Sequence, residues 1–234
     1  MGSSGFLRDV IWRVGPVEIT ASVVTTWIVM LALGVSAWIL TRKLRESLMA
    51  PRRIVLEGVV TALMNAVEDV LPGGTELVFP FIATLWIFIL TANLTGLIPG
   101  LSSPTADLSV TGSLAFVVFA SVHWFGIRAE GLGNYLRHYI RPNPIMLPFL
   151  LISEVSRTIA LAVRLFGNIT SLELVAFLVV MIAGLLVPIP LLILHIIEAV
   201  IQAYLFGMLA LVYIAGGIQT QEVRRRKERE AYQQ

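Results

Sequence analysis

SRTIALAVRLFGNITSLE, residues 156–173, lies within a long apolar run, residues 145–187. Arg164 stands near the middle of this run, and its guanidinium stays protonated at any working pH. A charged side chain at the centre of a bilayer costs at least about 2.5–3.5 kcal/mol. We therefore expect Arg164 to serve a function, rather than to be a long side chain that merely reaches the membrane surface.

The composition is that of a membrane protein. Hydrophobic residues make up 57% of the chain and charged residues 14%, with a mean hydropathy of +0.85. Soluble domains carry about 25% charged residues, so we expect an all-α, polytopic integral membrane protein with one membrane domain, residues 1–234. The first apolar run is too long for a cleavable signal peptide. The absence of cysteine excludes disulfides and thiolate metal sites.

Hydropathy predicts about five membrane-crossing helices at residues 19–40, 77–99, 108–127, 145–187 and 189–216. Residues 55–71 mix apolar and charged positions at helical spacing, which predicts an amphipathic helix. The last two crossings flank Pro188-Ile189-Pro190. At about 1.5 Å per residue both exceed a bilayer of about 30 Å. We therefore expect a steeply tilted helical hairpin.

Basic residues alternate between the loops. Five lie in residues 41–53, three in 128–141 and five in 224–229, whereas residues 100–107 and 185–190 have none. By the positive-inside rule the N-terminus is outside and the C-terminus is in the cytoplasm. Residues 217–234 are then a basic cytoplasmic tail that anchors the topology, and no nucleic-acid partner is expected.

Polar residues on the two long segments fall on restricted arcs. His195, Glu198 and Gln202 share about 60° of a helical wheel, and Arg164 and Asn168 lie within about 40°. In an antiparallel hairpin, one register places Gln202 level with Arg164 and also places His195 level with Glu173.

These residues suit ion transfer. Glu173, His195 and Glu198 can change protonation, and such groups mark proton paths in membranes. Arg164 cannot carry a proton, so we expect a fixed charge that favours the ionised form of a nearby carboxylate and blocks leakage. No acid lies four residues from Arg164, which suggests that its counter-charge belongs to another chain.

Five other polar positions have simpler readings. Glu154 and Arg157 have the spacing of a local helical ion pair. His123 is expected to be a hydrogen-bonded packing residue, and Asn93 a helix-packing group. Asp107 suits either a loop acid or a helix cap.

Several motifs resemble the a subunit of F-type rotary ATP synthases. They are RLFGN (164–168) followed by Glu173, QAYLF (202–206) after His195, FIATLWIFILTANLTGLIPG (81–100) and PTADLSVT (104–111). The resemblance covers residues 54–216, and RLFGN in this setting is its most specific part. The short chain and Glu198 are similar to the alternate, N-type branch of the family.

The resemblance implies a non-catalytic membrane stator in the membrane sector, whose last two helices wrap around a rotor ring of c subunits. Arg164 would be the essential arginine, with Asn168 as its neighbour and Gln202 as its partner. Glu173 and His195 would line the external half-channel, and Asp107 would lie near its mouth. The implied partners are the c ring, the b-subunit peripheral stalk, the rest of the ATP synthase and membrane lipid. No cofactor or metal is implied, and a bacterial inner membrane is the implied location.

Two other classes use similar residues. An intramembrane metalloenzyme could employ His195 and Glu198, although the chain has no HExxH motif or evident third ligand. A secondary transporter would be expected to show two matching halves, and no such repeat is found. The residues leave open whether the coupling ion is H⁺ or Na⁺, because the ion-binding carboxylate would belong to the ring.

Overall fold

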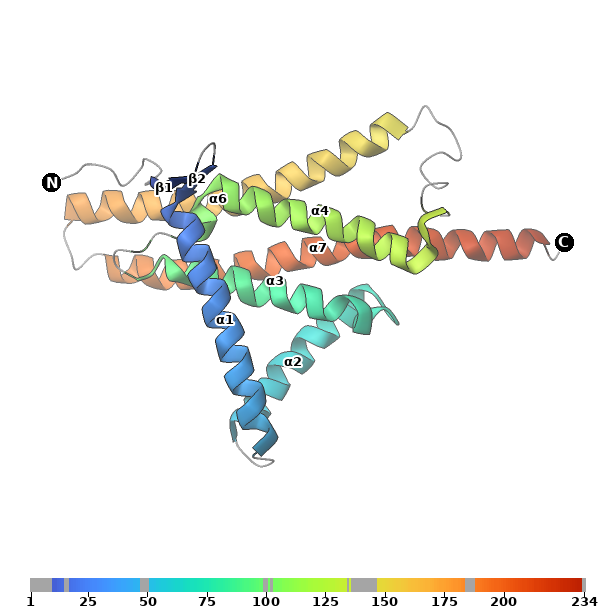
Figure 1. The fold of residues 1–234 in the computed structure, drawn as a ribbon, viewed down its shortest axis with the longest axis horizontal. Coiled ribbons are helices and arrows are strands. Elements are labelled where there is room, and N and C mark those ends of the chain that lie inside the picture. The colour runs from blue at the N-terminus through green and yellow to red at the C-terminus, as the bar shows by residue number, and fades with distance from the viewer. Residues whose placement is uncertain are drawn as a thin grey trace.

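The structure is a computed structural model that describes residues 10–14, 17–46, 51–98, 101, 103–133, 135, 147–183 and 188–232 (Figure 1). Its helices are α1 (Ala21–Glu46), α2 (Pro51–Val70), α3 (Thr75–Thr95), α4 (Leu108–Glu130), α6 (Leu147–Ala183) and α7 (Pro188–Tyr232), with a short 3₁₀ turn, η1 (Pro104–Ala106). Within these residues, five helices are long and apolar enough to cross a membrane: α1, α3, α4, α6 and α7. The predicted helical membrane architecture is confirmed.

A small β-hairpin at the N-terminal end was not predicted. Strands β1 (Val10–Val14) and β2 (Val17–Thr20) pair antiparallel and lead directly into α1. Both strands are rich in β-branched residues, which favour extended backbone. The first helix consequently begins at Ala21 rather than at residue 19.

Four helices, α3, α4, α6 and α7, run along the long axis of the molecule, whereas α1 crosses them steeply and α2 returns toward α3 (Figure 1). Helix α7 packs against α3, α4 and α6. Apolar side chains from these helices and from α2 form one core, which includes Ile82, Ile89, Leu165, Phe206 and Leu211. Because lipid tails are as apolar as these side chains, the core stabilises the bundle mainly through van der Waals packing.

The turn between α2 and α3 is closed by hydrogen bonds to one carboxylate. Glu68 accepts a hydrogen bond from the Thr75 hydroxyl and another, of 3.2 Å, from the backbone N–H of Gly73. Gly73 has a φ of 77°, a conformation that glycine adopts without a steric penalty. The bond from Thr75, followed by that from Gly73, holds the pKa of Glu68 below its ordinary value.

Thr75→Ala is expected to raise the pKa of Glu68 toward its ordinary value, because the stronger of its two donors is lost. A lowered folded-state pKa stabilises the turn above the unfolded-state value, and this contribution disappears as the pH falls through the folded-state pKa. Glutamate carboxyl-carbon NMR would follow the titration. Thr95→Ala, which removes only a hydroxyl bonded to Thr91 O, is the matched control. An unchanged Glu68 titration in Thr75→Ala would contradict the assignment.

The two long helices differ from their predicted limits. Residues 145–146 and 184–187 of the first predicted segment lie outside the described residues. The second continues as helix α7 to Tyr232, through the basic tail. That tail is rich in Arg, Lys, Glu and Gln, which are good helix formers, so polar sequence does not end the helix.

Candidate functional site

Arg164 projects from the outer surface of α6. Its side chain is exposed, whereas Leu161 and Leu165 on the same helix are 2% and 0% exposed. Within the described part of the chain, Arg164 makes no recorded hydrogen bond or ion pair. Helix α6 thus packs its apolar stripe inward and presents a permanent positive charge on its exposed surface, next to exposed Ile159 and Val163.

One turn further along α6, Asn168 connects the two long helices. Its Nδ2 donates to Oε1 of Gln202 over 2.8 Å. Gln202 is 2% exposed, and its Nε2 is buried without a hydrogen-bond partner among the described residues. The predicted register placed Gln202 level with Arg164. The hydrogen bond instead goes to the residue one helical turn on, so the predicted alignment was close but offset.

Glu173 lies where α6 meets the segment between α3 and α4. Its Oε1 accepts a hydrogen bond of 3.0 Å from the backbone N–H of Ser103. A methyl group added at Gly96 would lie 3.2 Å from the same oxygen and 3.1 Å from Cβ of Ser103. The absence of a side chain at Gly96 therefore leaves room for the Glu173 carboxylate.

His195 reaches the same region from α7. It is 6% exposed, and its Nε2 lies 3.3 Å from the backbone oxygen of Asn93. A carbonyl oxygen only accepts, so Nε2 carries the proton of this hydrogen bond. The acceptor on His195 in its neutral form is therefore Nδ1. His195 also interacts electrostatically with Glu173, as the predicted register required.

Asn93 is the centre of a buried polar network. Its Oδ1 accepts a 2.6 Å hydrogen bond from Thr105, and its Nδ2 donates over 3.5 Å to the backbone oxygen of Ala199. The hydroxyls of Ser103 and Thr105 lie 2.6 Å apart. We call Asn93, Ser103, Thr105, Glu173 and His195 the Asn93 cluster. It joins helices α3, α6 and α7 to η1 and to Ser103, the residue just before η1.

The sequence did not identify the central members of this cluster. Asn93 was assigned a packing role, and Ser103 and Thr105 were not singled out. Asn93 stands in a largely apolar segment, and this was the signal that sequence reasoning missed. The residue is fully buried, and the polar atoms of a buried asparagine need hydrogen-bond partners. Only the folding of the loop onto α3 brings those partners to it.

The other two predicted site residues, Asp107 and Glu198, lie close in the sequence to members of the Asn93 cluster. Asp107 caps α4 by accepting a hydrogen bond of 2.8 Å from the backbone N–H of Ser109, which selects the cap from the two predicted roles. Glu198 is partly buried on α7, three residues from His195, and interacts electrostatically with it.

These features define a class: a polytopic helical membrane protein with an exposed intramembrane arginine and a buried cluster of titratable groups. The family described as ATP synthase A chain matches residues 23–215. The ATP synthase subunit a of Legionella pneumophila (strain Paris) is 61% identical over 97% of this chain and 99% of its own length. The ATP synthase subunit a 2 of Pelobacter propionicus is 56% identical over 94% and 96%, respectively.

The chain belongs to the ATP synthase A chain family, the a subunits of the membrane sector. It is an integral membrane protein and a stator component of an ATP synthase, with a role in ion translocation. The predicted family and function are confirmed. Assignment to the N-type branch stays a prediction.

Proposed function

We propose that this subunit, itself non-catalytic, conducts ions between the two sides of the membrane and the carboxylates of a c-subunit ring. Arg164 would separate two aqueous half-channels as a fixed charge. Ion flow would then turn the ring and couple to ATP synthesis or hydrolysis.

One observation carries this proposal: a permanent cation with no recorded partner among the described residues lies on the outside of a membrane helix. A lipid-facing arginine without a counter-charge is unfavourable, so the surface of α6 needs a partner that carries an acid. At about 4 Å and an effective dielectric constant of 20, such a pair gains about 4 kcal/mol. That is on the order of a 10³-fold preference for the ionised acid, sufficient to make it release its ion.

The Asn93 cluster would form the external half-channel, with Glu198 beside His195 and Asp107 near the mouth. Glu173 lies nine residues from Arg164, or about 14 Å along the helix. The adjoining residues 100–107 contain no lysine or arginine, which favours the outer side of the membrane. Asn168 and Gln202 would fix α6 against α7 beside the arginine.

The orientation follows from the same charge pattern, with the N-terminus outside and the basic C-terminal end of α7 in the cytoplasm. The exposed face of α6 would meet the c ring. A b-subunit stalk and the rest of the complex would hold the chain against rotation in a bacterial inner membrane.

The test is ATP-driven pumping by the reconstituted complex that carries Glu173→Gln. We expect pumping to fall by on the order of 10²-fold, because a positioned proton-transfer group is lost. Glu76→Gln, at an exposed acid in the first turn of α3, is the control and should pump normally. Normal pumping by assembled Glu173→Gln complexes would remove Glu173 from the proposed channel.

The same vesicles identify the ion. Wild-type pumping without Na⁺ that a protonophore collapses would identify H⁺. Pumping that requires Na⁺ and survives a protonophore would identify Na⁺. ATP-independent solute transport by the isolated chain would favour a secondary transporter instead.

A further inference from the structure

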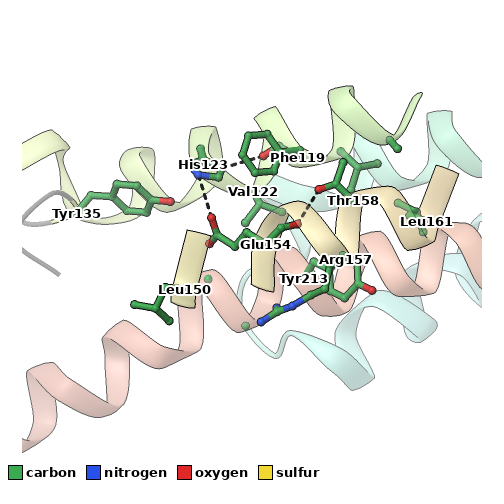
Figure 2. Close-up of a pocket in the computed structure, with 14 residues that line it drawn as sticks. Phe119, Val122, His123, Tyr135, Leu150, Glu154, Arg157, Thr158, Leu161 and Tyr213 are labelled. Atoms are coloured by element: carbon green, nitrogen blue, oxygen red, sulfur yellow. Dashed lines mark hydrogen bonds and ion pairs between the residues drawn. The ribbon is translucent and has the colours of Figure 1, made fainter. Parts of the chain in front are cut away.

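A second titratable site lies away from the Asn93 cluster, in a cavity of about 270 Å³ between α4, α6 and α7 (Figure 2). Its walls carry His123 from α4, Glu154 and Arg157 from α6, and Tyr213 from α7, with Tyr135 just beyond α4. A water molecule needs roughly 10–15 Å³ of such space and a few polar partners. The cavity is therefore large and polar enough to hold several waters.

His123 and Glu154 form a close contact that a proton between them would stabilise. Nδ1 of His123 lies 2.9 Å from the backbone oxygen of Phe119, so Nδ1 is the donor of that hydrogen bond. Nε2 points at Oε2 of Glu154 over 3.4 Å (Figure 2). If neither atom held a proton, a nitrogen lone pair would face a carboxylate oxygen. The stable pair is imidazolium with carboxylate, or imidazole with carboxylic acid, and each holds one proton at this contact.

The surroundings keep this proton exchangeable. About a quarter of each side chain is exposed, 28% for His123 and 23% for Glu154, whereas Oε2 of Glu154 is itself buried. Water can therefore reach the two side chains but not that oxygen directly. Arg157 lies on the same helix, where its Nη2 donates to Ser153 over 3.3 Å and its guanidinium stands 5.6 Å from the Tyr213 ring.

Two aromatic rings lie close to the ring of His123. The ring of Phe119 lies 4.4 Å from that of His123, and the ring of Tyr135 lies 6.0 Å from it. Aromatic rings near an imidazolium stabilise its charge. Among the described residues that line the cavity, the titratable and charged groups are His123, Tyr135, Glu154, Arg157 and Tyr213.

The pair has a defined place relative to Arg164. Glu154 precedes Arg164 by ten residues, or about 15 Å along α6, and Glu173 follows it at about 14 Å. The two titratable sites thus lie at similar distances on opposite sides of the fixed charge. Arg128 and the basic end of α7 belong to the same end of the bundle as the cavity, which is the cytoplasmic end in the proposed orientation.

We propose that the His123–Glu154 pair is a proton-binding site that exchanges protons with cytoplasmic water through this cavity. Uptake moves a proton from a hydronium ion in the cavity to Nε2 of His123, beside the Glu154 carboxylate. Release returns the proton to cavity water and leaves a neutral imidazole beside the Glu154 carboxylate. The inference rests on the proposed function in one respect: protons leaving the ring on the cytoplasmic side of Arg164 pass by this pair.

The first arm of the test measures proton binding without transport. In the intact reconstituted complex, infrared difference spectra between acidic and alkaline buffer should contain imidazole and carboxyl bands that Glu154→Gln and His123→Gln both remove. If neither variant changes the spectrum, the pair binds no exchangeable proton and the proposal is overturned.

The second arm measures passive proton flux through the membrane sector after the soluble part is stripped. Glu154→Gln should lower the flux by on the order of 10²-fold. The double variant His123→Leu with Glu154→Leu fills the site with apolar side chains and should assemble yet show the same loss. Wild-type flux in that assembled double variant would make the pair purely structural.

Arg164→Ala in parallel separates this proposal from the proposed function. Loss of the infrared bands in Glu154→Gln together with normal pumping in Arg164→Ala would retain the proton site and reject the fixed-charge mechanism. A wild-type complex that pumps only Na⁺ would reject the pair as part of the ring's ion route, whatever the spectra show.

Discussion

Arg164→Ala is expected to abolish ATP-driven ion pumping by the reconstituted complex while the complex still assembles. The side chain is exposed and makes no recorded contact within the described part of the chain, so its removal leaves the packing of α6 unchanged. What is lost is the preference for an ionised ring acid, on the order of 10³-fold for a pair at about 4 Å and a dielectric constant of 20.

The matched control is Arg42→Ala, which removes an arginine that lies 4.1 Å above the Trp38 ring at the far end of α1. Arg164→Lys is a second comparison, because it keeps the charge but not the planar fork of donors. Coupled pumping at the wild-type rate in assembled Arg164→Ala complexes would refute the fixed-charge role.

Gly207→Ala is expected to have the largest effect on stability. A methyl group at this position would lie 2.0 Å from Nε1 and 2.3 Å from Cδ1 of Trp86. Trp86 is 4% exposed, donates from Nε1 to the backbone oxygen of Tyr204 over 3.2 Å and stacks on the Tyr204 ring at 6.0 Å. The indole cannot move aside without losing these contacts. Overpacking of this kind costs about 1–3 kcal/mol or more.

The yield of assembled complex and its thermal stability in detergent measure this effect. Gly112→Ala is the control, because no atom lies within 4 Å of the added methyl group. Combining Gly207→Ala with Trp86→Leu should restore part of the lost stability by removing the clashing indole. Equal stability of Gly207→Ala and Gly112→Ala would contradict the close packing of α3 on α7.

The sequence predicted the helical spans well because their lengths and apolar content are set by the bilayer. Chemical logic also singled out Arg164, since a permanent charge in such a run is unfavourable wherever the chain folds, and its role stays a prediction. The predicted register placed Gln202 level with Arg164, one helical turn from Asn168, which is its hydrogen-bond partner. Register along two long helices depends on packing between them, which helical spacing alone does not contain.

Contacts between distant segments were harder to predict. Ser103 binds Glu173 and Thr105 binds Asn93 because the loop after α3 folds back over two helices, and no local pattern specifies that path. His123 was expected to pack with a hydrogen bond, which it makes, but its contact with Glu154 joins residues 31 positions apart. Glu154 had been paired in sequence with Arg157, which donates a hydrogen bond to Ser153 and lies over the Tyr213 ring.

The bonds near the two ends of α6 have a mechanical consequence. Between them the helix is held by the hydrogen bond of Asn168 to Gln202 and by the packing of Leu161, Leu165 and Ile169, and apolar packing is non-directional, so it resists sliding and twisting weakly. The hydrogen bond from Ser103 to Glu173 and the contact of His123 with Glu154 are directional and fix the helix lengthwise. In the proposed function, the ring turns against α6 and exerts a reaction torque on it. Helix α6 then resembles a beam supported at both ends, and weakening either support should lower the load against which the motor can turn.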